Sequence, residues 1–272
     1  MIWTACRKEN RMISSTSNPR IKNLKKLMTS ARFRREKDCF PVEGPRMFFE
    51  IPKDRILETY VTESFKDRYE EALRAYPHEV IEDRIMRSLS DTRTPQGVLA
   101  LVRRQETRLS DLLDKEGSRA FLLLENLQDP GNLGTILRTA EAAGMTGVIV
   151  DRRSVDPYNT KVIRSSMGAI LRLPLMECDD LLPVCQHMKT AGIRIFAGHL
   201  DGEPLYRSDF RGSCAFLIGN EGQGLSPEIM AQADQGIRIP MKGKVESLNA
   251  AMAAAVLMYE LLRQREWTGD DR

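Results

Sequence analysis

The sequence predicts an α/β fold built from two domains, and three observations support this prediction. The chain has 272 residues, which exceeds the usual size of one domain. From residue 119 onward, short apolar runs alternate with helix-like segments, a pattern typical of a parallel sheet covered by helices. Residues 1–118 contain 24 Lys and Arg against 19 Asp and Glu, whereas residues 119–272 contain 17 against 19. The first domain is therefore the basic one.

Composition limits the class of protein. Hydrophobic residues make up 42% and charged residues 29%, as in ordinary soluble proteins. No apolar run reaches the roughly 18 residues of a membrane helix, and no secretory signal is visible, so we expect a cytoplasmic protein without a membrane partner. The five cysteines are scattered without a C-x-x-C pair, which favours reduced thiols. The three histidines are isolated, so we predict no metal site.

Residues 1–11 show no periodicity, and we interpret them as a disordered extension or the product of an upstream start codon, with Met12 as the alternative first residue. Asn18 and Pro19 then begin an amphipathic helix. Its apolar positions recur at helical spacing, whereas its lysines form a basic face that continues into a run of arginines. The apolar positions are Ile21, Leu24 and Met28, and the basic ones are Lys22, Lys25, Lys26, Arg32, Arg34, Arg35 and Lys37. Such a face is often only a solvated surface, and that alternative stays open here.

The rest of the first domain, to residue 104, alternates between strands and helices. Residues 56–62 and 97–102 are β-preferring apolar runs, a helix is expected around 67–75, and residues 94–97 form a turn before the last strand. Residues 105–118 are polar and charged, so we interpret them as a linker. Leu109, Leu112 and Leu113 predict a short helix within it.

The second domain, residues 119–272, opens with a βαβ unit. Residues 121–125 are a strand buried on both faces, residues 128–134 a loop, and the following helix ends at Ala143 with Gly144 as its cap. A strand over residues 148–151 completes the unit. The later elements alternate in the same way: helices over residues 159–166 and 181–190, strands over 170–174, 193–197, 214–219 and 236–239, and a final helix from Ser247 to Arg265 with Ser247 as its N-cap.

A dinucleotide-binding Rossmann domain is the rival interpretation, because Asp151 ends the second strand. The loop argues against it. Gly131 and Gly134 do not have the G-x-G-x-x-G spacing, and neither Pro130 nor Asn132 has a role in a pyrophosphate turn.

A glycine-rich loop follows the strand at 214–219. Gly219, Gly222 and Gly224 occupy three of six consecutive positions, so backbone can approach a ligand closely there. A second strand end and the start of the last helix should meet the same crevice. We therefore expect a ligand pocket at this edge of the sheet.

Three segments carry a resemblance to a known family. They are residues 126–138 (Asn-Leu-Gln-Asp-Pro-Gly-Asn-Leu-Gly-Thr-Ile-Leu-Arg), 216–225 (Phe-Leu-Ile-Gly-Asn-Glu-Gly-Gln-Gly-Leu) and 237–249. In order and spacing they resemble the three motifs of the SpoU (TrmH-type) RNA 2′-O-ribose methyltransferases of the SPOUT superfamily. Residues 40–46 (Phe-Pro-Val-Glu-Gly-Pro-Arg) resemble a signature of that family's substrate-binding domain. The resemblance covers residues 12–265.

The resemblance implies a fold and an activity. The fold is an N-terminal ribosomal-protein-like α/β/α domain that binds RNA, followed by a parallel-sheet SPOUT domain with a trefoil knot that forms a homodimer over its cofactor. The activity is methyl transfer from S-adenosylmethionine to a ribose 2′-hydroxyl, with 23S ribosomal RNA preferred over transfer RNA. A catalytically inactive RNA-binding assembly factor of the same fold remains an alternative.

The resemblance also implies roles for individual residues. Arg138 matches the position assigned to the base, although phosphate binding or stabilisation of the developing alkoxide suits a guanidinium better. Taken singly, Asn132 could only stabilise its turn, Ser247 only cap a helix, and Glu221 only be a solvated acid. The implied cofactor-binding residues are Gly219, Ile239, Leu248, Leu217 and Asn220; the implied catalytic residues are Arg138, Asn132, Glu221, Ser247 and Asn249; and the implied RNA-binding residues are Lys22, Lys25, Lys26, Arg32, Arg34 and Arg35.

Overall fold

The structure is a computed structural model that describes residues 12–90, 92–245 and 247–266. The chain divides into two compact units, Met1–Arg104 and Gln105–Arg272. The extension expected at residues 1–11, with Cys6, lies outside the described residues.

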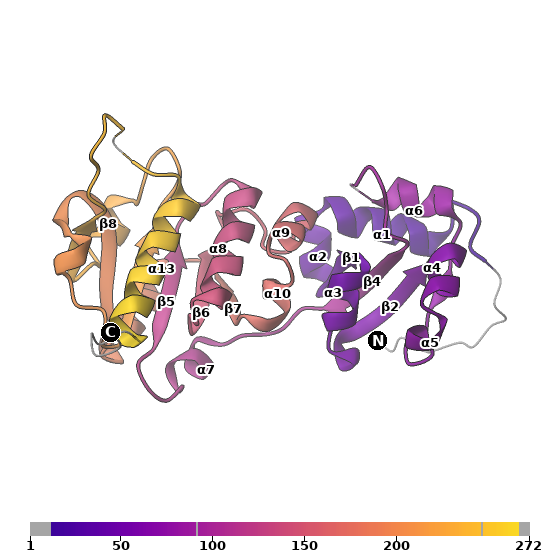
Figure 1. The fold of residues 1–272 in the computed structure, drawn as a ribbon, viewed down its shortest axis with the longest axis horizontal. Coiled ribbons are helices and arrows are strands. Elements are labelled where there is room, and N and C mark those ends of the chain that lie inside the picture. The colour runs from indigo at the N-terminus through magenta and orange to yellow at the C-terminus, as the bar shows by residue number, and fades with distance from the viewer. Residues whose placement is uncertain (1–11, 91, 246, 267–272) are drawn as a thin grey trace, which may run out of the picture. The chain divides into compact units, whose positions relative to one another are not determined.

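The first unit is a sheet packed with short helices (Figure 1). In chain order its elements are α1 (Pro19–Thr29), α2 (Ala31–Lys37), β1 (Cys39–Glu43), α3 (Pro45–Glu50), η1 (Lys53–Arg55), β2 (Ile56–Val61), α4 (Glu63–Arg68), α5 (Glu70–Leu73), β3 (Glu79–Val80), α6 (Asp83–Leu89) and β4 (Val98–Arg103). Its described strands have the order β1-β4-β2-β3, in which β4 is antiparallel to both neighbours and β3 is parallel to β2.

The first helix confirms the amphipathic pattern. The Asn18 side chain accepts a hydrogen bond from the Arg20 N–H, and Pro19 occupies the first turn, so the helix begins where the sequence predicts. Its buried residues are Ile21, Leu24, Leu27 and Met28, and its lysines are exposed. The single helix predicted around residues 67–75 is wrong: α4 and α5 are separate, because Tyr69 leaves helical geometry at φ −119° and ψ 28°.

The second unit is a parallel sheet with helices. Its elements are α7 (Leu109–Leu113), β5 (Ala120–Leu124), α8 (Pro130–Ala142), β6 (Gly147–Asp151), α9 (Thr160–Ser165), α10 (Ala169–Arg172), β7 (Leu175–Cys178), α11 (Leu181–Thr190), β8 (Arg194–Pro204), η2 (Leu205–Arg207), β9 (Cys214–Ile218), α12 (Pro227–Met230), β10 (Gln235–Arg238) and α13 (Ala250–Glu266). The described strands have the order β10-β8-β9-β5-β6-β7, and each pair is parallel. Helices α8 and α13 lie side by side (Figure 1).

Burial explains the apolar runs that mark the strands. All five residues of β5, β6 and β9 are buried, as expected for central parallel strands with both faces covered. The short helix predicted from Leu109, Leu112 and Leu113 is α7, and its Leu112 packs into the core of the second unit.

Several element boundaries differ from the prediction. Residues 170–174 are not a strand: α10 occupies most of this stretch, and the strand is β7, one residue beyond it. Met167 and Gly168 both have positive φ, which reverses the chain just before a short apolar run whose periodicity cannot separate helix from strand. Helix α8 begins at Pro130, earlier than predicted, because the Asp129 carboxylate caps it by accepting from the Asn132 N–H at 2.8 Å.

The last helix begins later than predicted. It starts at Ala250, and the Asn249 side-chain oxygen accepts hydrogen bonds from the N–H groups of Ala251 and Met252 at 2.9 and 3.3 Å. Asn249 is therefore the N-cap, and the assignment of that role to Ser247 is wrong.

The four described cysteines are free and buried. Burial raises the pKa of the thiols of Cys39 and Cys185 to about 11, and that of Cys178 and Cys214 to about 12. These thiols are consequently unreactive packing groups at neutral pH.

Candidate functional site

A cavity of about 380 Å³ lies where β9 and β10 end and α13 begins. Ligands of open parallel sheets bind at the carboxyl ends of the strands, which is the edge that this cavity occupies. We call it the strand-end cavity. Its lining includes all five residues with a predicted cofactor role, namely Leu217, Gly219, Asn220, Ile239 and Leu248, together with Glu221 and Ser247.

The glycine-rich loop folds back on itself. The N–H of Asn220 donates to the Gly224 carbonyl at 3.0 Å, and the Gly224 N–H donates to the Asn220 carbonyl at 2.9 Å. A Cβ atom on Gly219 would lie 2.2 Å from the Gly224 carbonyl carbon. Glycine is therefore required at position 219 because the backbone of the same loop leaves no room for a side chain. The sequence alone did not show this contact.

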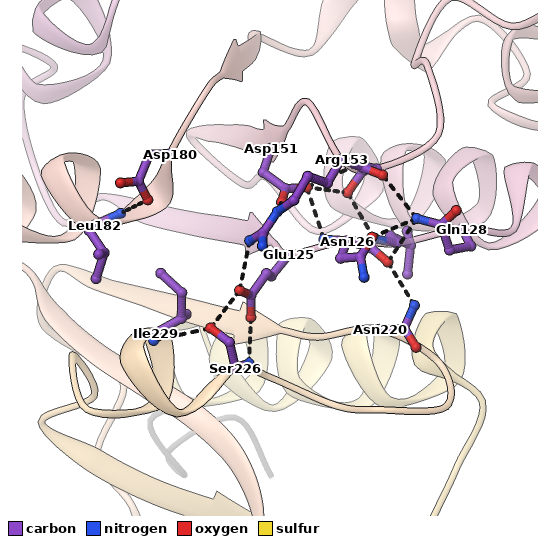
Figure 2. Close-up of polar contacts among 12 residues, drawn as sticks. Glu125, Asn126, Gln128, Asp151, Arg153, Asp180, Leu182, Asn220, Ser226 and Ile229 are labelled. Atoms are coloured by element: carbon purple, nitrogen blue, oxygen red, sulfur yellow. Dashed lines mark hydrogen bonds and ion pairs between the residues drawn. The ribbon is translucent and has the colours of Figure 1, made fainter.

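Asn220 organises this loop through both ends of its side chain. Its carbonyl oxygen accepts from the N–H groups of Gly222 and Gln223 at 2.9 and 3.0 Å, and its amide donates to the Asn126 carbonyl at 2.9 Å. Figure 2 shows this last contact, in which the loop after β9 meets the loop after β5. The polar atoms of Asn220 are thus engaged within the protein.

Glu221 joins the glycine-rich loop to the start of α8. Its carboxylate accepts three hydrogen bonds of 3.0 Å, from the backbone N–H groups of Gln128 and Asp129 and from the side-chain amide of Asn132. Partial burial alone would raise the pKa of Glu221, but these hydrogen bonds prevail and lower it. Glu221 is therefore an ionised anchor at neutral pH.

The polar chain continues from Glu221 to the last helix. Because the Asn132 amide donates to Glu221, its oxygen is free to accept from the Asn249 amide, at 2.9 Å. Asn249 in turn caps α13. Three predicted catalytic residues, Glu221, Asn132 and Asn249, thus form one hydrogen-bonded chain that connects three segments of the sequence.

Arg138 stands apart from this chain. It lies on α8 six residues after Asn132, which corresponds to about 9 Å along a helix axis. Its side chain is exposed and does not line the strand-end cavity. Within the described residues, the structure brings the other four predicted catalytic residues to the cavity or to its hydrogen-bonded rim, but not Arg138.

A cluster of buried acids beside the site was missed by sequence reasoning (Figure 2). The Glu125 side chain, 3% exposed, accepts from the N–H and hydroxyl of Ser226 at 2.8 and 2.7 Å. Asp151, 1% exposed, accepts from the Asn126 N–H at 2.9 Å. Arg153 donates to both carboxylates at 2.9 Å, and the two acids raise the pKa of its guanidinium. The cluster fixes the loops after β5 and β9.

The position of Asp151 also bears on the Rossmann alternative. Its carboxylate is buried and bound to Asn126, Arg153 and Ser154, so it is not presented to a ribose. The sequence signal for the cluster was present, since Glu125 and Asp151 each end an apolar run, but the partners lie elsewhere in the chain.

The predicted RNA-binding face is exposed with one exception. Lys22, Lys25, Lys26, Arg32 and Arg35 are exposed. Arg34 is only 2% exposed, and its guanidinium donates to the carbonyls of Leu27 and Met28 at 2.5 and 3.2 Å, at the end of α1. The assignment of Arg34 to RNA binding is therefore wrong, because it satisfies helix-terminal carbonyls instead.

The residues described here contain no cluster of three or more His, Cys, Asp and Glu side chains able to hold a metal ion. Among their helices, none combines the length and apolarity needed to cross a membrane.

Comparison with known proteins gives two family matches. The description "SpoU rRNA Methylase family" applies to a model that matches residues 119–259, and "MRM3-like substrate binding domain" to one that matches residues 18–100. The chain is 30% identical over 256 residues to the 23S rRNA (guanosine(2553)-2′-O)-methyltransferase RlmP of Bacillus subtilis, an alignment that covers 92% of this chain and 99% of that protein.

Solved structures are similar over nearly the whole chain. The SpoU methyltransferase AviRb from Streptomyces viridochromogenes, in complex with the cofactor AdoMet, has a TM-score of 0.82 at 28% identity and covers 91% of this chain and 98% of its own. An AdoMet-bound rRNA methyltransferase from Sinorhizobium meliloti has a TM-score of 0.81 at 27% identity, with coverage of 94% and 98%.

Proposed function

Because this chain belongs to the SpoU rRNA methylase family and is an RNA methyltransferase, we propose that it methylates a ribose 2′-hydroxyl of 23S ribosomal RNA in the cytoplasm. The observation that carries the proposal is the convergence of two features. Gly219, Ile239 and Leu248 line one cavity, and the chain of Glu221, Asn132 and Asn249 borders it.

The strand-end cavity suits S-adenosylmethionine as the methyl donor. Its volume of about 380 Å³ is within the range of small-ligand sites. Its lining combines apolar side chains with a loop in which the backbone of Gly222 and Gly224 is exposed. Gly219, Ile239 and Leu248 would hold the adenosine part through backbone groups, and Leu217 through its side chain. The cofactor supplies an electrophilic methyl group on a sulfonium.

The hydrogen-bonded chain would position the target nucleotide. Glu221 holds the Asn132 amide in one orientation, and Asn249 occupies the remaining Asn132 oxygen. The start of α8 and the start of α13 are thereby fixed relative to each other, which places a rigid polar rim beside the cavity. Displacement at a methyl carbon requires in-line alignment, so rigidity of this rim contributes directly to rate.

Arg138 would act on the RNA rather than as a base. A guanidinium stays protonated in proteins and so cannot accept a proton, whereas its fork of donors matches a phosphate and its charge stabilises a developing alkoxide. We expect Arg138→Ala to abolish methyl transfer while leaving cofactor affinity within about twofold. Arg138→Lys, the matched control, retains the charge and should keep partial activity. Full activity in the alanine variant would refute the assignment.

The exposed lysines of α1 and the exposed arginines of α2 would bind RNA phosphates without reading sequence. Ribosomal RNA is favoured over transfer RNA because the relative aligned along 99% of its length is named as a 23S rRNA methyltransferase. Mapping of 2′-O-methyl groups in total RNA, from cells with and without the gene, tests this. If cells without the gene lack one 2′-O-methyl group in ribosomal RNA, the proposal is supported. If they lack such a group only in transfer RNA, the substrate is transfer RNA instead.

We further propose that the second unit is knotted and forms a homodimer. Met252 and Tyr259, seven residues apart and therefore on one face of α13, are 51% and 50% exposed although both are large and apolar. Such a face is typical of an interface. A second chain seated there would be one way to complete the surroundings of Arg138, which lies on the neighbouring helix α8.

The alternative that the sequence left open is an inactive RNA-binding assembly factor. It would have the same fold and RNA affinity but would not bind the cofactor. Calorimetry with S-adenosylmethionine separates the two: saturable heat with one site per chain supports the enzyme, and the absence of heat supports the assembly factor.

A further inference from the structure

A second cavity, of about 830 Å³, lies within the first unit and has no role in the function proposed above. It is bordered by the end of β2 at Thr62, by α4, by α6 and by the turn over residues 94–97. We call it the arginine cavity, because among the described residues Arg68, Arg87 and Arg93 line it together with one acid, Asp83.

Two sequence signatures of the first domain shape this cavity. Gly97 has φ +81°, and a Cβ atom there would lie 2.7 Å from the Thr62 hydroxyl and 2.8 Å from the Phe65 Cβ. Gly44 has φ +99°, and a Cβ atom there would lie 2.5 Å from the Gln96 side-chain oxygen. Both positions thus require glycine for their backbone conformation, and position 97 requires it for space as well, because the Phe65 Cβ cannot move aside as the end of the Gln96 side chain can.

Glu43, beside Gly44, fixes the segment that leads into the turn. Its carboxylate accepts hydrogen bonds from the hydroxyls of Ser90 and Thr92 at 2.6 and 3.3 Å, and Ser90 also accepts from the Thr92 N–H at 3.0 Å. The Glu-Gly pair and the turn at 94–97 therefore act together to hold one wall of the arginine cavity. Specific residues are therefore required to form this wall.

The chemistry of the lining suits a nucleotide. Phe65 and Met86 are buried and form an apolar floor, whereas Arg68 and Arg87 are exposed at the rim. The Arg68 guanidinium lies over the Tyr69 ring at 5.4 Å from its centroid. Arginine forks bind phosphate bidentately, and aromatic rings and guanidinium planes stack on unpaired bases. Exposed arginines are often only solvated, but here they converge on one concave surface.

We propose that the arginine cavity binds an unstacked nucleotide of single-stranded RNA, with its phosphate on Arg68 and Arg87 and its base against the Tyr69 side. The site rests on the proposed function in that this nucleotide belongs to the RNA substrate and is a different nucleotide from the methylated one. It is separate from the exposed lysines of α1, Lys22, Lys25 and Lys26, which would contact phosphates of RNA whose bases remain stacked.

The test uses the full chain carrying Arg87→Ala and the double change Arg68→Ala with Arg87→Ala. Arg74→Ala is the matched control, because Arg74 is an exposed arginine of the same unit that does not line the cavity. Binding of a fluorescent single-stranded RNA is measured by anisotropy without cofactor, and KM and kcat are measured for methylation of ribosomal RNA.

We expect the single variant to weaken single-stranded RNA binding about tenfold and to raise KM for RNA similarly, with kcat and cofactor affinity unchanged. The double variant should bind single-stranded RNA more weakly still. The salt dependence of its binding should fall by the amount that about two phosphate contacts contribute. Binding of a duplex RNA of the same length should change less than twofold. Equal losses on duplex and single strand, or losses equal to those of Arg74→Ala, would overturn the proposal.

The two proposals fail separately. If the wild-type protein transfers no methyl group but its single-stranded RNA binding depends on Arg87, the proposed reaction fails and the cavity assignment stands. If methylation proceeds with unchanged KM in both variants, the cavity assignment fails and the reaction stands.

Discussion

Replacing Glu221 by glutamine should expose the role of its carboxylate most clearly. One carboxylate oxygen accepts from Asp129 and Asn132, and the other accepts from the Gln128 N–H. A glutamine can keep the first two bonds with its oxygen, but its NH2 group then faces the Gln128 N–H. One charge-assisted bond is lost, and two become neutral and about half as strong.

The size of the effect follows from these contacts. Charge-assisted hydrogen bonds contribute about 1.5–3 kcal/mol each, but Glu221 is only partly buried and solvent weakens its hydrogen bonds. We therefore take about 1–2 kcal/mol for the whole change in the free energy of unfolding. For a unit of this size that is roughly 3–6 °C in Tm. Glu228→Gln is the matched control, because Glu228 is an exposed acid of the same unit outside the strand-end cavity.

The effect should depend on pH in a defined direction. The hydrogen bonds lower the pKa of Glu221 in the folded protein, so its stabilisation is present above the ordinary glutamate pKa, about 4.3, and is lost as the pH falls through the lower folded value. The difference in unfolding free energy between wild type and Glu221→Gln should therefore shrink towards zero below about pH 4. Denaturant unfolding at a series of pH values measures it. A difference that does not change with pH, or no difference at pH 7, would refute the anchoring role.

Three further predictions test other parts of the structure. Gly219→Ala should weaken S-adenosylmethionine binding at least tenfold by calorimetry, because its Cβ would collide with the Gly224 backbone, whereas Gly212→Ala, in open space, should bind normally; equal affinities would contradict this account of the loop. Arg34→Ala should lower the free energy of unfolding by about 2–4 kcal/mol, because buried carbonyls lose their donor, whereas Lys22→Ala should change it by less than about 0.5 kcal/mol; urea midpoints that shift equally would argue against a structural Arg34. Tyr259→Asp should convert a dimer to monomer in sedimentation experiments, and a wild-type monomer would remove the basis for the proposed interface.

Much of the fold could be predicted from the sequence because its signals are local. The central strands are continuous apolar runs, and α1 combines a proline, a capping asparagine and a helical apolar period. The family and the α/β architecture with a parallel second sheet are confirmed. Strand β8, by contrast, continues to Pro204, well beyond the predicted Ala197, because its later residues pair with β10 at the sheet edge across an irregular register. No local pattern encodes that pairing.

The site was less predictable where contacts join distant parts of the chain. Motif positions indicated Asn132, Glu221 and Asn249, but not that they bond to one another, because 89 and 117 residues separate the bonded pairs. Arg34 was misassigned because consecutive arginines look alike in sequence, and only the turn between α1 and α2 directs one of them inward. The acid cluster around Arg153 was not predicted because its members are distant in the sequence: Glu125 and Ser226 are 101 residues apart.

The most direct measurement of the central claim is methyl transfer with a chemical identification of the product. Purified protein is incubated with isotopically labelled S-adenosylmethionine and ribosomal RNA from cells that lack the gene, and the RNA is digested to nucleosides for mass spectrometry. We expect one 2′-O-methylnucleoside to carry the label, and none to form with Arg138→Ala. Label on a base, or no label with a protein that binds the cofactor, would contradict ribose methylation by this site.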